Sequence, residues 1–268
     1  MRRHPQTRVA VAVPTSECHL ERLRYAELCA VRSIFREHGH VLEIGGGNGY
    51  QATVLASWGF NVTSIDIDTE GAWTRRHFEV KTYDGKTIPA GSGTADVIFS
   101  SNVLEHVPRT DLEILFSEMR RVLARGGIAV HILPSPIWRF WTIMAHYPWL
   151  ILRLVRGAKK ESGMVLPTLA EAANRRGLLG LLKRACWPAP HGAYPSCGAE
   201  LFAFRESVWR RRFEAGGFEV VSCRPNGIFY TGYTVFPRLP MSWRRSLAKL
   251  LGSACNIYVV KPGDRFAS

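Results

Sequence analysis

The chain has 268 residues and a formal net charge of +13, and its composition is 46% hydrophobic and 21% charged. That length accommodates one large α/β domain or two smaller ones, and the hydrophobic fraction excludes a disordered chain. The six cysteines show no CxxC spacing, so we expect reduced thiols of a cytoplasmic protein, with neither a metal site nor a disulfide framework.

The first half of the chain alternates helix-like and strand-like segments. Apolar residues at helical spacing predict a helix over 17–38, after which the run VLEI ends in glycines 45–49. A short helix (51–58), the strand-like run NVTSIDID and the less regular stretch FEVKTYDG follow. Next come a strand over 95–100, a helix that Asp111 should cap and Gly126-Gly127 should end, and the strand IAVHIL. Strands separated by helices predict βαβ units and a parallel sheet.

This alternation stops from residue 135 to about 202, where an aromatic stretch, a helical patch and a Pro-rich loop occur. A helix over 205–215 and the strands FEVVSC and CNIYVVK are expected beyond it. We therefore divide the chain into an N-terminal helical segment (1–40), a cofactor-binding core (41–134), an insertion that forms a substrate lid (135–202), and a C-terminal part of the same sheet (203–268).

The excess positive charge lies entirely in the second half of the chain. Residues 1–134 hold 15 basic and 15 acidic residues, whereas residues 135–268 hold 20 and 7. That half either meets a negatively charged partner or forms a solvated basic face, and composition alone favours neither. The longest apolar stretch, 137–155, contains arginines and a proline, which argues against a membrane span. The first 17 residues are too poor in apolar side chains to predict a secretory signal.

The segment VLEIGGGNGY predicts a strand, a glycine turn and the start of a helix. Gly45, Gly47 and Gly49 permit left-handed backbone angles and let a ligand approach the backbone, although an ordinary tight turn also uses glycines. Tyr50 stands where a dinucleotide fingerprint needs its third glycine, and no Lys-Ser/Thr pair follows as in a triphosphate loop. Asp66 ends the next strand, where an acid can accept both ribose hydroxyls. Together these residues favour a ligand built from adenosine and a small zwitterion.

In combination these pieces resemble the class I S-adenosylmethionine-dependent methyltransferases, in particular the small-molecule branch called type 11. The matching pieces, in order, are VLEIGGGNGY, SIDID, the YDG turn, ADVIFSSNVLEHV and RVLARGGIAVHI, and they cover roughly residues 41–133. The resemblance implies an α/β, Rossmann-like fold: a mostly parallel seven-stranded sheet with helices on both faces and an insertion after the fifth strand. It also implies S-adenosyl-L-methionine as the cofactor and methyl transfer as the activity.

The resemblance further implies which residues contact the cofactor. Those expected at its methionine end are Glu43 (where many members have Asp), Gly45, Gly47, Gly49 and Asn102. Those expected at its ribose and adenine end are Asp66 on the ribose, Ile67 packed on the ring, and Asp84 with Gly85 at the adenine amino group.

Glu105 and His106 are the candidate catalytic residues, because they follow the strand 95–100 at the edge where parallel-sheet sites open. Methyl transfer from a sulfonium mainly needs alignment and desolvation, and a base is needed only if the acceptor keeps its proton, as a hydroxyl does. In related enzymes an acid-His pair at the corresponding place faces the methyl group. The alternative is that His106 only packs under the lid. His131, within a predicted strand, and His146, within the aromatic stretch, are expected to be structural.

The acceptor should meet the insertion, where Trp138, Trp141 and His191 are the candidate contacts. A lone loop histidine is more often a surface residue, so His191 ranks below His106. The aromatic stretch 137–155 and the segment 175–184 mix tryptophan or leucine with Lys and Arg, and one interpretation is a lid that meets an anionic membrane surface or an anionic, lipid-linked acceptor. The competing interpretation is a buried aromatic cap whose arginines are merely solvated.

Three functions remain open at this stage. The leading one is methyl transfer, with O-methylation first, to a small-molecule or lipid- or sugar-linked acceptor by a cytoplasmic protein that meets the membrane peripherally. An RNA methyltransferase would suit the charge, but no RNA-binding module is recognisable and FSSNVLEHV lacks the Asn/Asp-Pro-Pro-Tyr/Phe motif, so nucleic acid is not the expected partner. A catalytically silent cofactor-binding subunit is the third. The sequence does not indicate an oligomeric state.

Overall fold

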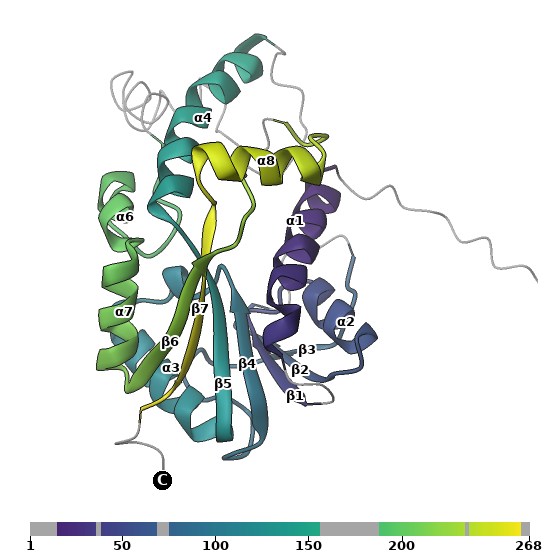
Figure 1. Ribbon diagram of the computed structural model, residues 1–268, viewed down its shortest axis with the longest axis vertical. Coiled ribbons are helices and arrows are strands. Elements are labelled where there is room, and N and C mark those ends of the chain that lie inside the picture. The colour runs from purple at the N-terminus through teal and green to yellow at the C-terminus, as the bar shows by residue number, and fades with distance from the viewer. Residues whose placement is uncertain (1–14, 36–38, 69–74, 156–187, 234–235, 264–268) are drawn as a thin grey trace, which may run out of the picture.

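The computed structural model describes residues 15–35, 39–68, 75–155, 188–233 and 236–263, and the statements below concern these ranges (Figure 1). Seven strands form one sheet in the order β3-β2-β1-β4-β5-β7-β6. Their bounds are β1 His40–Ile44, β2 Asn61–Asp66, β3 Val80–Thr82, β4 Ala95–Ser101, β5 Leu123–Pro134, β6 Phe218–Pro225 and β7 Cys255–Pro262. Strands β1 to β5 pair in parallel, and β7 pairs antiparallel with both β5 and β6. The predicted mostly parallel, seven-stranded sheet is confirmed.

Helices cover both faces of this sheet, as predicted (Figure 1). The helices are α1 Thr15–Val31, α2 Tyr50–Ser57, α3 Arg109–Val122, α4 Pro136–Val155, α6 Cys197–Ala203, α7 Glu206–Ala215 and α8 Met241–Leu251, with short 3₁₀ turns η1 Arg32–Ile34 and η2 Leu104–His106. Side chains of β4 alternate between the two faces: Val97 and Phe99 pack in the cluster with α1 and α2, and Ile98 packs in the cluster with α3 and α7. Each face therefore has its own apolar core.

Both predicted boundaries of the helix around Asp111 were wrong. Helix α3 begins at Arg109 after Pro108, so Asp111 lies inside its first turn, where a negative charge still favours the helix N-terminus. The helix ends at Val122, and Gly126 and Gly127 belong to β5. They form an irregularity there, because the pairing register of β5 with β4 shifts between Leu123 and Ile128. A glycine pair read as a helix stop is in fact a bulge within a strand.

The expected insertion follows β5 and begins with α4, which extends beyond the edge of the sheet with α8 across its base (Figure 1). The predicted helical patch and the segment 175–184 lie outside the described residues. Within the described ranges, none of the helices combines the length and apolar character that a bilayer span requires. The parallel arrangement places the carboxyl ends of β1, β2, β3 and β4 at one edge, and the candidate site lies there.

Candidate active site

The glycine loop after β1 has the backbone that only glycine adopts readily. Gly45, Gly47 and Gly49 have φ angles of 81°, 54° and 77°. A Cβ on Gly45 would collide with the Val103 side chain. The N–H groups of Gly45 and Gly46 donate to the Ile65 carbonyl at 2.8 and 3.1 Å, which holds the loop against β2. The loop is therefore packed closely against β2 and Val103 on one side, and on its other side it lines a cavity.

Asp66 ends β2 and fixes this loop from the side. Its Oδ2 accepts a hydrogen bond from the Gly47 N–H at 2.8 Å, and the half-buried carboxylate lines a cavity of about 650 Å³. The next residue, Ile67, lines the same cavity with 65% of its surface exposed. A ligand with a ribose and a flat ring would fit here, because the acid can bind the ribose hydroxyls and the ring can cover the exposed isoleucine.

Asp84 and Gly85 form the far wall of the cavity, after β3. The Asp84 Oδ1 accepts from the N–H groups of Thr87 at 2.7 Å and Lys86 at 2.8 Å, and these bonds lower the pKa of Asp84, so the carboxylate is ionised at neutral pH. Gly85 has a φ of 77°, and a Cβ there would come within 3.2 Å of Ile67. The turn thus holds an anion beside the exposed Ile67.

Asn102 lies at the end of β4 with a φ of 56°, and no other non-glycine residue in the described ranges has a positive φ. Its N–H donates to the Ile132 carbonyl at 2.8 Å, and the residue lines the cavity. Asparagine tolerates the left-handed region better than most residues, and such backbone outliers gather at functional sites.

Two residues expected at the cofactor lie behind the cavity wall rather than in it. Glu43 is buried beside Gly46, and its Oε2 accepts from the Ser64 hydroxyl at 2.5 Å. Burial raises the pKa of Glu43 to about 7. Gly49 precedes the first residue of α2 and packs against the Phe78 backbone. Both residues support the glycine loop from below.

Helix α1 forms a further wall of the cavity, which the sequence analysis did not predict. Arg24 lines the cavity and pairs with the buried Glu27 at 2.6 Å. Glu27 also accepts from the hydroxyls of Ser101 at 3.0 Å and Tyr230 at 2.6 Å. The Tyr230 hydroxyl contacts Cys255 Sγ at 2.9 Å. The one visible signal was a glutamate on the apolar side of the predicted helix 17–38.

Glu105 and His106 lie in η2, directly after β4. His106 lines the cavity with 44% of its side chain exposed, and burial of the rest lowers its pKa, so its imidazole is neutral at neutral pH. The Glu105 side chain is fully buried, and neither of its oxygens has a hydrogen-bond partner among the described residues. Burial raises the pKa of Glu105 to about 8. The Glu105 Oε1 is 3.8 Å from the His106 Nε2.

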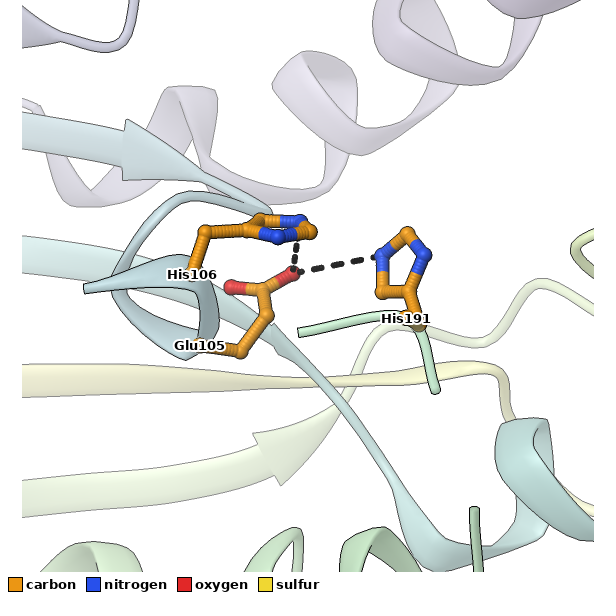
Figure 2. A group of neighbouring side chains, drawn as sticks. All are labelled: Glu105, His106 and His191. Atoms are coloured by element: carbon orange, nitrogen blue, oxygen red, sulfur yellow. Dashed lines mark ion pairs between the residues drawn. The ribbon is translucent and has the colours of Figure 1, made fainter. Parts of the chain in front are cut away.

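His191 joins this pair, as Figure 2 shows. Its Nε2 is 3.9 Å from the Glu105 Oε1, and its ring centroid is 4.6 Å from that of His106. Burial, with the neighbouring His106 and Arg139, lowers the pKa of His191 to about 4. The ring centroid of Trp138 is 4.7 Å from that of His191, in an edge-to-face arrangement. The structure therefore brings together the acid-His pair and two of the expected acceptor contacts.

Trp141, the third of those contacts, lies elsewhere. Its Nε1 donates to the Leu251 carbonyl at 3.1 Å, and it lines a separate, largely apolar cavity of about 380 Å³ between α4 and α8. His131 is buried and bonded to the Ser100 hydroxyl at 2.8 Å, and burial lowers its pKa to about 3. The His146 Nδ1 bonds the Tyr233 hydroxyl at 2.8 Å. Both histidines have the structural environment expected for them.

Comparison with known sequences finds a family match within part of the chain. Residues 42–131 match the profile described as "Methyltransferase domain". An uncharacterized methyltransferase of Mycobacterium sp. (strain JLS) is 35% identical over 102 residues, which are 37% of this chain and 39% of that protein. One from Mycobacterium bovis (strain BCG) is 34% identical over 104 residues, with the same coverage. The match thus spans about two-fifths of the curated relatives' length.

Solved structures share the fold over most of the chain. A SAM-dependent methyltransferase from Archaeoglobus fulgidus superimposes with a TM-score of 0.51 and 14% identity, covering 90% of this chain and 94% of that one. One from Methanosarcina mazei gives a TM-score of 0.50 and 14% identity, covering 87% and 96%. At this identity the likeness establishes the Rossmann-like α/β architecture.

Proposed function

We propose that the chain, whose residues 42–131 match the methyltransferase domain profile, is a class I methyltransferase of the type 11 family that transfers a methyl group from S-adenosyl-L-methionine to a hydroxyl of an amphiphilic acceptor. The observation that carries the proposal is the shared cavity: the glycine loop, Asp66, Ile67 and His106 all line it. The activity would be cytoplasmic, at or near a membrane surface.

The residues of the cavity fit this cofactor by their chemistry. Asp66 holds Gly47 with one lone pair and keeps others for the ribose hydroxyls. The exposed face of Ile67 suits the adenine ring, and the ionised Asp84 suits an amino-group donor. Gly45 lies against Val103, directly before η2, and Asn102 and His106 line the same cavity, so the methionine moiety would lie next to His106. When bound, the cofactor supplies a methyl group on a sulfonium that leaves as a neutral thioether.

His106 is the proposed proton acceptor for the hydroxyl. Its imidazole is neutral at physiological pH because burial lowers its pKa, so it can accept a proton as the oxygen attacks. Glu105 lies behind it and takes the orienting role. We favour O-methylation because a hydroxyl acceptor needs a base at this place, whereas an amine that is already neutral does not.

An amphiphilic acceptor is favoured by an apolar stripe on α4. Five of its members recur every three or four residues along one helix face, Leu152 adjoins the last of them, and each is at least 39% exposed: Ile137, Phe140, Met144, Tyr147, Ile151 and Leu152. Helix α8 crosses the base of α4 and adds Trp243 and Leu250, which are 64% and 81% exposed, with the exposed cations Arg245 and Lys249. Exposed tryptophan and aliphatic side chains beside cations are typical of surfaces that lie in a lipid interface.

The chain should therefore sediment with anionic vesicles at low salt and be released as salt is raised. Trp243→Ala combined with Leu250→Ala should weaken this binding, because both side chains leave water when the surface inserts. Substitution of Val221, which is 54% exposed on β6 away from α8, is the matched control. If the protein stays in the supernatant with anionic vesicles at low salt, the stripe does not bind membranes and only covers the acceptor.

Transfer of label from methyl-labelled S-adenosyl-L-methionine into fractionated cell extract tests the function itself. We expect label in the lipid-soluble fraction. Label in RNA would instead favour the nucleic-acid alternative, and cofactor binding without any transfer would favour a silent subunit.

A further inference from the structure

The three side chains of Figure 2 form a ligand set of their own. We propose that Glu105, His106 and His191 bind one divalent transition-metal ion, best matched by Zn²⁺, at the edge of the cofactor cavity. Their ligand atoms all lie within 4.8 Å of one another. The Glu105 Oε1 is the common neighbour, 3.8 Å from the His106 Nε2 and 3.9 Å from the His191 Nε2.

These distances suit an ion between the groups better than direct contact. Hydrogen bonds of this kind are about 2.7–3.2 Å long, so the imidazoles do not bond the carboxylate directly. Around a tetrahedral Zn²⁺ with ligands at about 2.0–2.2 Å, neighbouring ligand atoms lie about 3.4 Å apart. The two Glu105–imidazole distances exceed this spacing by about 0.5 Å, and no pair of ligand atoms exceeds it by more than about 1.4 Å, gaps that rotation of the two partly exposed imidazoles can close.

The buried carboxylate is the independent reason to expect a cation. The Glu105 side chain is fully buried, and both of its oxygens lack a hydrogen-bond partner among the described residues. Burying a carboxylate without a partner is costly, and proteins pair such groups with cations or metals. Each imidazole presents its Nε2 to the Glu105 Oε1, but at 3.8 and 3.9 Å neither nitrogen is close enough to donate a hydrogen bond, so a cation or a water between them would satisfy the carboxylate.

The third ligand is held in place from the insertion side. Glu200 Oε1 accepts from the N–H groups of His191 at 2.6 Å and Gly192 at 2.7 Å, and Glu200 is itself paired with the buried Arg139 at 2.8 Å. A Cβ on Gly192 would collide with the Glu105 carbonyl oxygen, which shows how closely this loop packs on η2. These contacts fix the backbone that carries His191 beside Glu105.

Two imidazoles and one carboxylate are the donor set of catalytic zinc sites that keep a fourth position open, and they disfavour Mg²⁺ and Ca²⁺, which take oxygen ligands. Because His106 lines the cavity, that position would face the acceptor. The next step rests on the proposed methyl transfer but replaces His106 as the proton acceptor, because an imidazole nitrogen bound to Zn²⁺ cannot also take a proton. An acceptor hydroxyl bound there would release its proton to solvent water, and its oxygen would form the O–CH₃ bond as the C–S bond breaks and its electron pair stays on sulfur.

Zinc binding by the tag-free full chain, stripped with a chelator and titrated with Zn²⁺ against a chromophoric competitor, tests the site without any acceptor. We expect one ion per chain. His191→Ala and Glu105→Gln should each weaken binding by more than the 10- to 100-fold that loss of an outer contact costs. His77→Ala is the matched control, because His77 also pairs with a glutamate, Glu21 at 2.8 Å, but outside the cluster.

Thermal unfolding of each variant reports whether it is folded, and calorimetry with S-adenosyl-L-methionine reports the cofactor site separately. Loss of zinc binding with both readouts unchanged supports the site. No zinc binding by the stripped wild-type chain, or equal affinity in His191→Ala, would overturn it and leave a water-bridged acid-His pair. Zinc binding without methyl transfer would contradict the proposed function and leave the metal site standing.

Discussion

Asp66→Ala should weaken the binding of S-adenosyl-L-methionine by about 10- to 150-fold, which corresponds to the 1.5–3 kcal/mol of a hydrogen bond to a charged group. The substitution removes the acceptor expected for the ribose hydroxyls. It also removes the partner of the Gly47 N–H, so the glycine loop loses its lateral contact with β2. Isothermal titration calorimetry on both proteins measures the change directly.

Asp68→Ala is the control for this prediction, since Asp68 is exposed two residues away and does not line the cavity. Asp66→Asn keeps a carbonyl oxygen for Gly47 and should lie between wild type and alanine. Equal affinity of Asp66→Ala and wild type, or tight binding of NAD by wild type, would contradict the assignment of the cavity.

His106→Ala should lower kcat by about 100-fold or more while the affinity for S-adenosyl-L-methionine stays near wild type. The reason is positional: 44% of the His106 side chain is exposed in the cavity, so alanine removes a proton acceptor without opening a core. The rate is followed as incorporation of labelled methyl into the fraction that wild type labels.

The matched control is His40→Ala, because His40 is the first residue of β1 and lies at the opposite end of that strand from the cavity. An unchanged rate in His106→Ala would remove this residue from the chemistry and leave alignment as the source of the rate. A parallel loss of cofactor affinity would mean that His106 holds the cofactor instead.

Much of the cofactor half could be predicted because its signals are local. Gly45, Asp66, Ile67, Asp84 and Asn102 each stand at or just after the end of a strand, and parallel strands carry their ends to one edge. The order of apolar strands and intervening turns along the chain is therefore enough to predict that these residues lie at one site. Glu43 shows the limit of this reasoning. The strand pattern correctly places Glu43 on β1, but it does not predict on which side of the glycine loop its carboxylate lies.

The acceptor half could not be predicted in the same way. His191 meets Glu105 because Glu200 and Arg139 hold its loop, and no spacing in the sequence indicates that pairing. Trp138 and Trp141 are three residues apart on α4, yet one packs on His191 and the other lines a different cavity. The end of α3 was predicted wrongly for a comparable reason. A Gly-Gly pair can end a helix or form a bulge in a strand, and which of these occurs depends on the neighbouring strand.

Glu27 has a consequence for the order in which the chain can fold. Its partners Ser101 and Tyr230 lie 74 and 203 residues further along the sequence. Contacts of such long separation form late, and a chain on the ribosome has no Tyr230 to offer until most of it has been synthesised. Helix α1 is synthesised first and can pack on α2 and β1 early, but Glu27 gains the Tyr230 hydroxyl only when most of the chain has been made, so the α1 wall of the cavity is completed after the glycine loop.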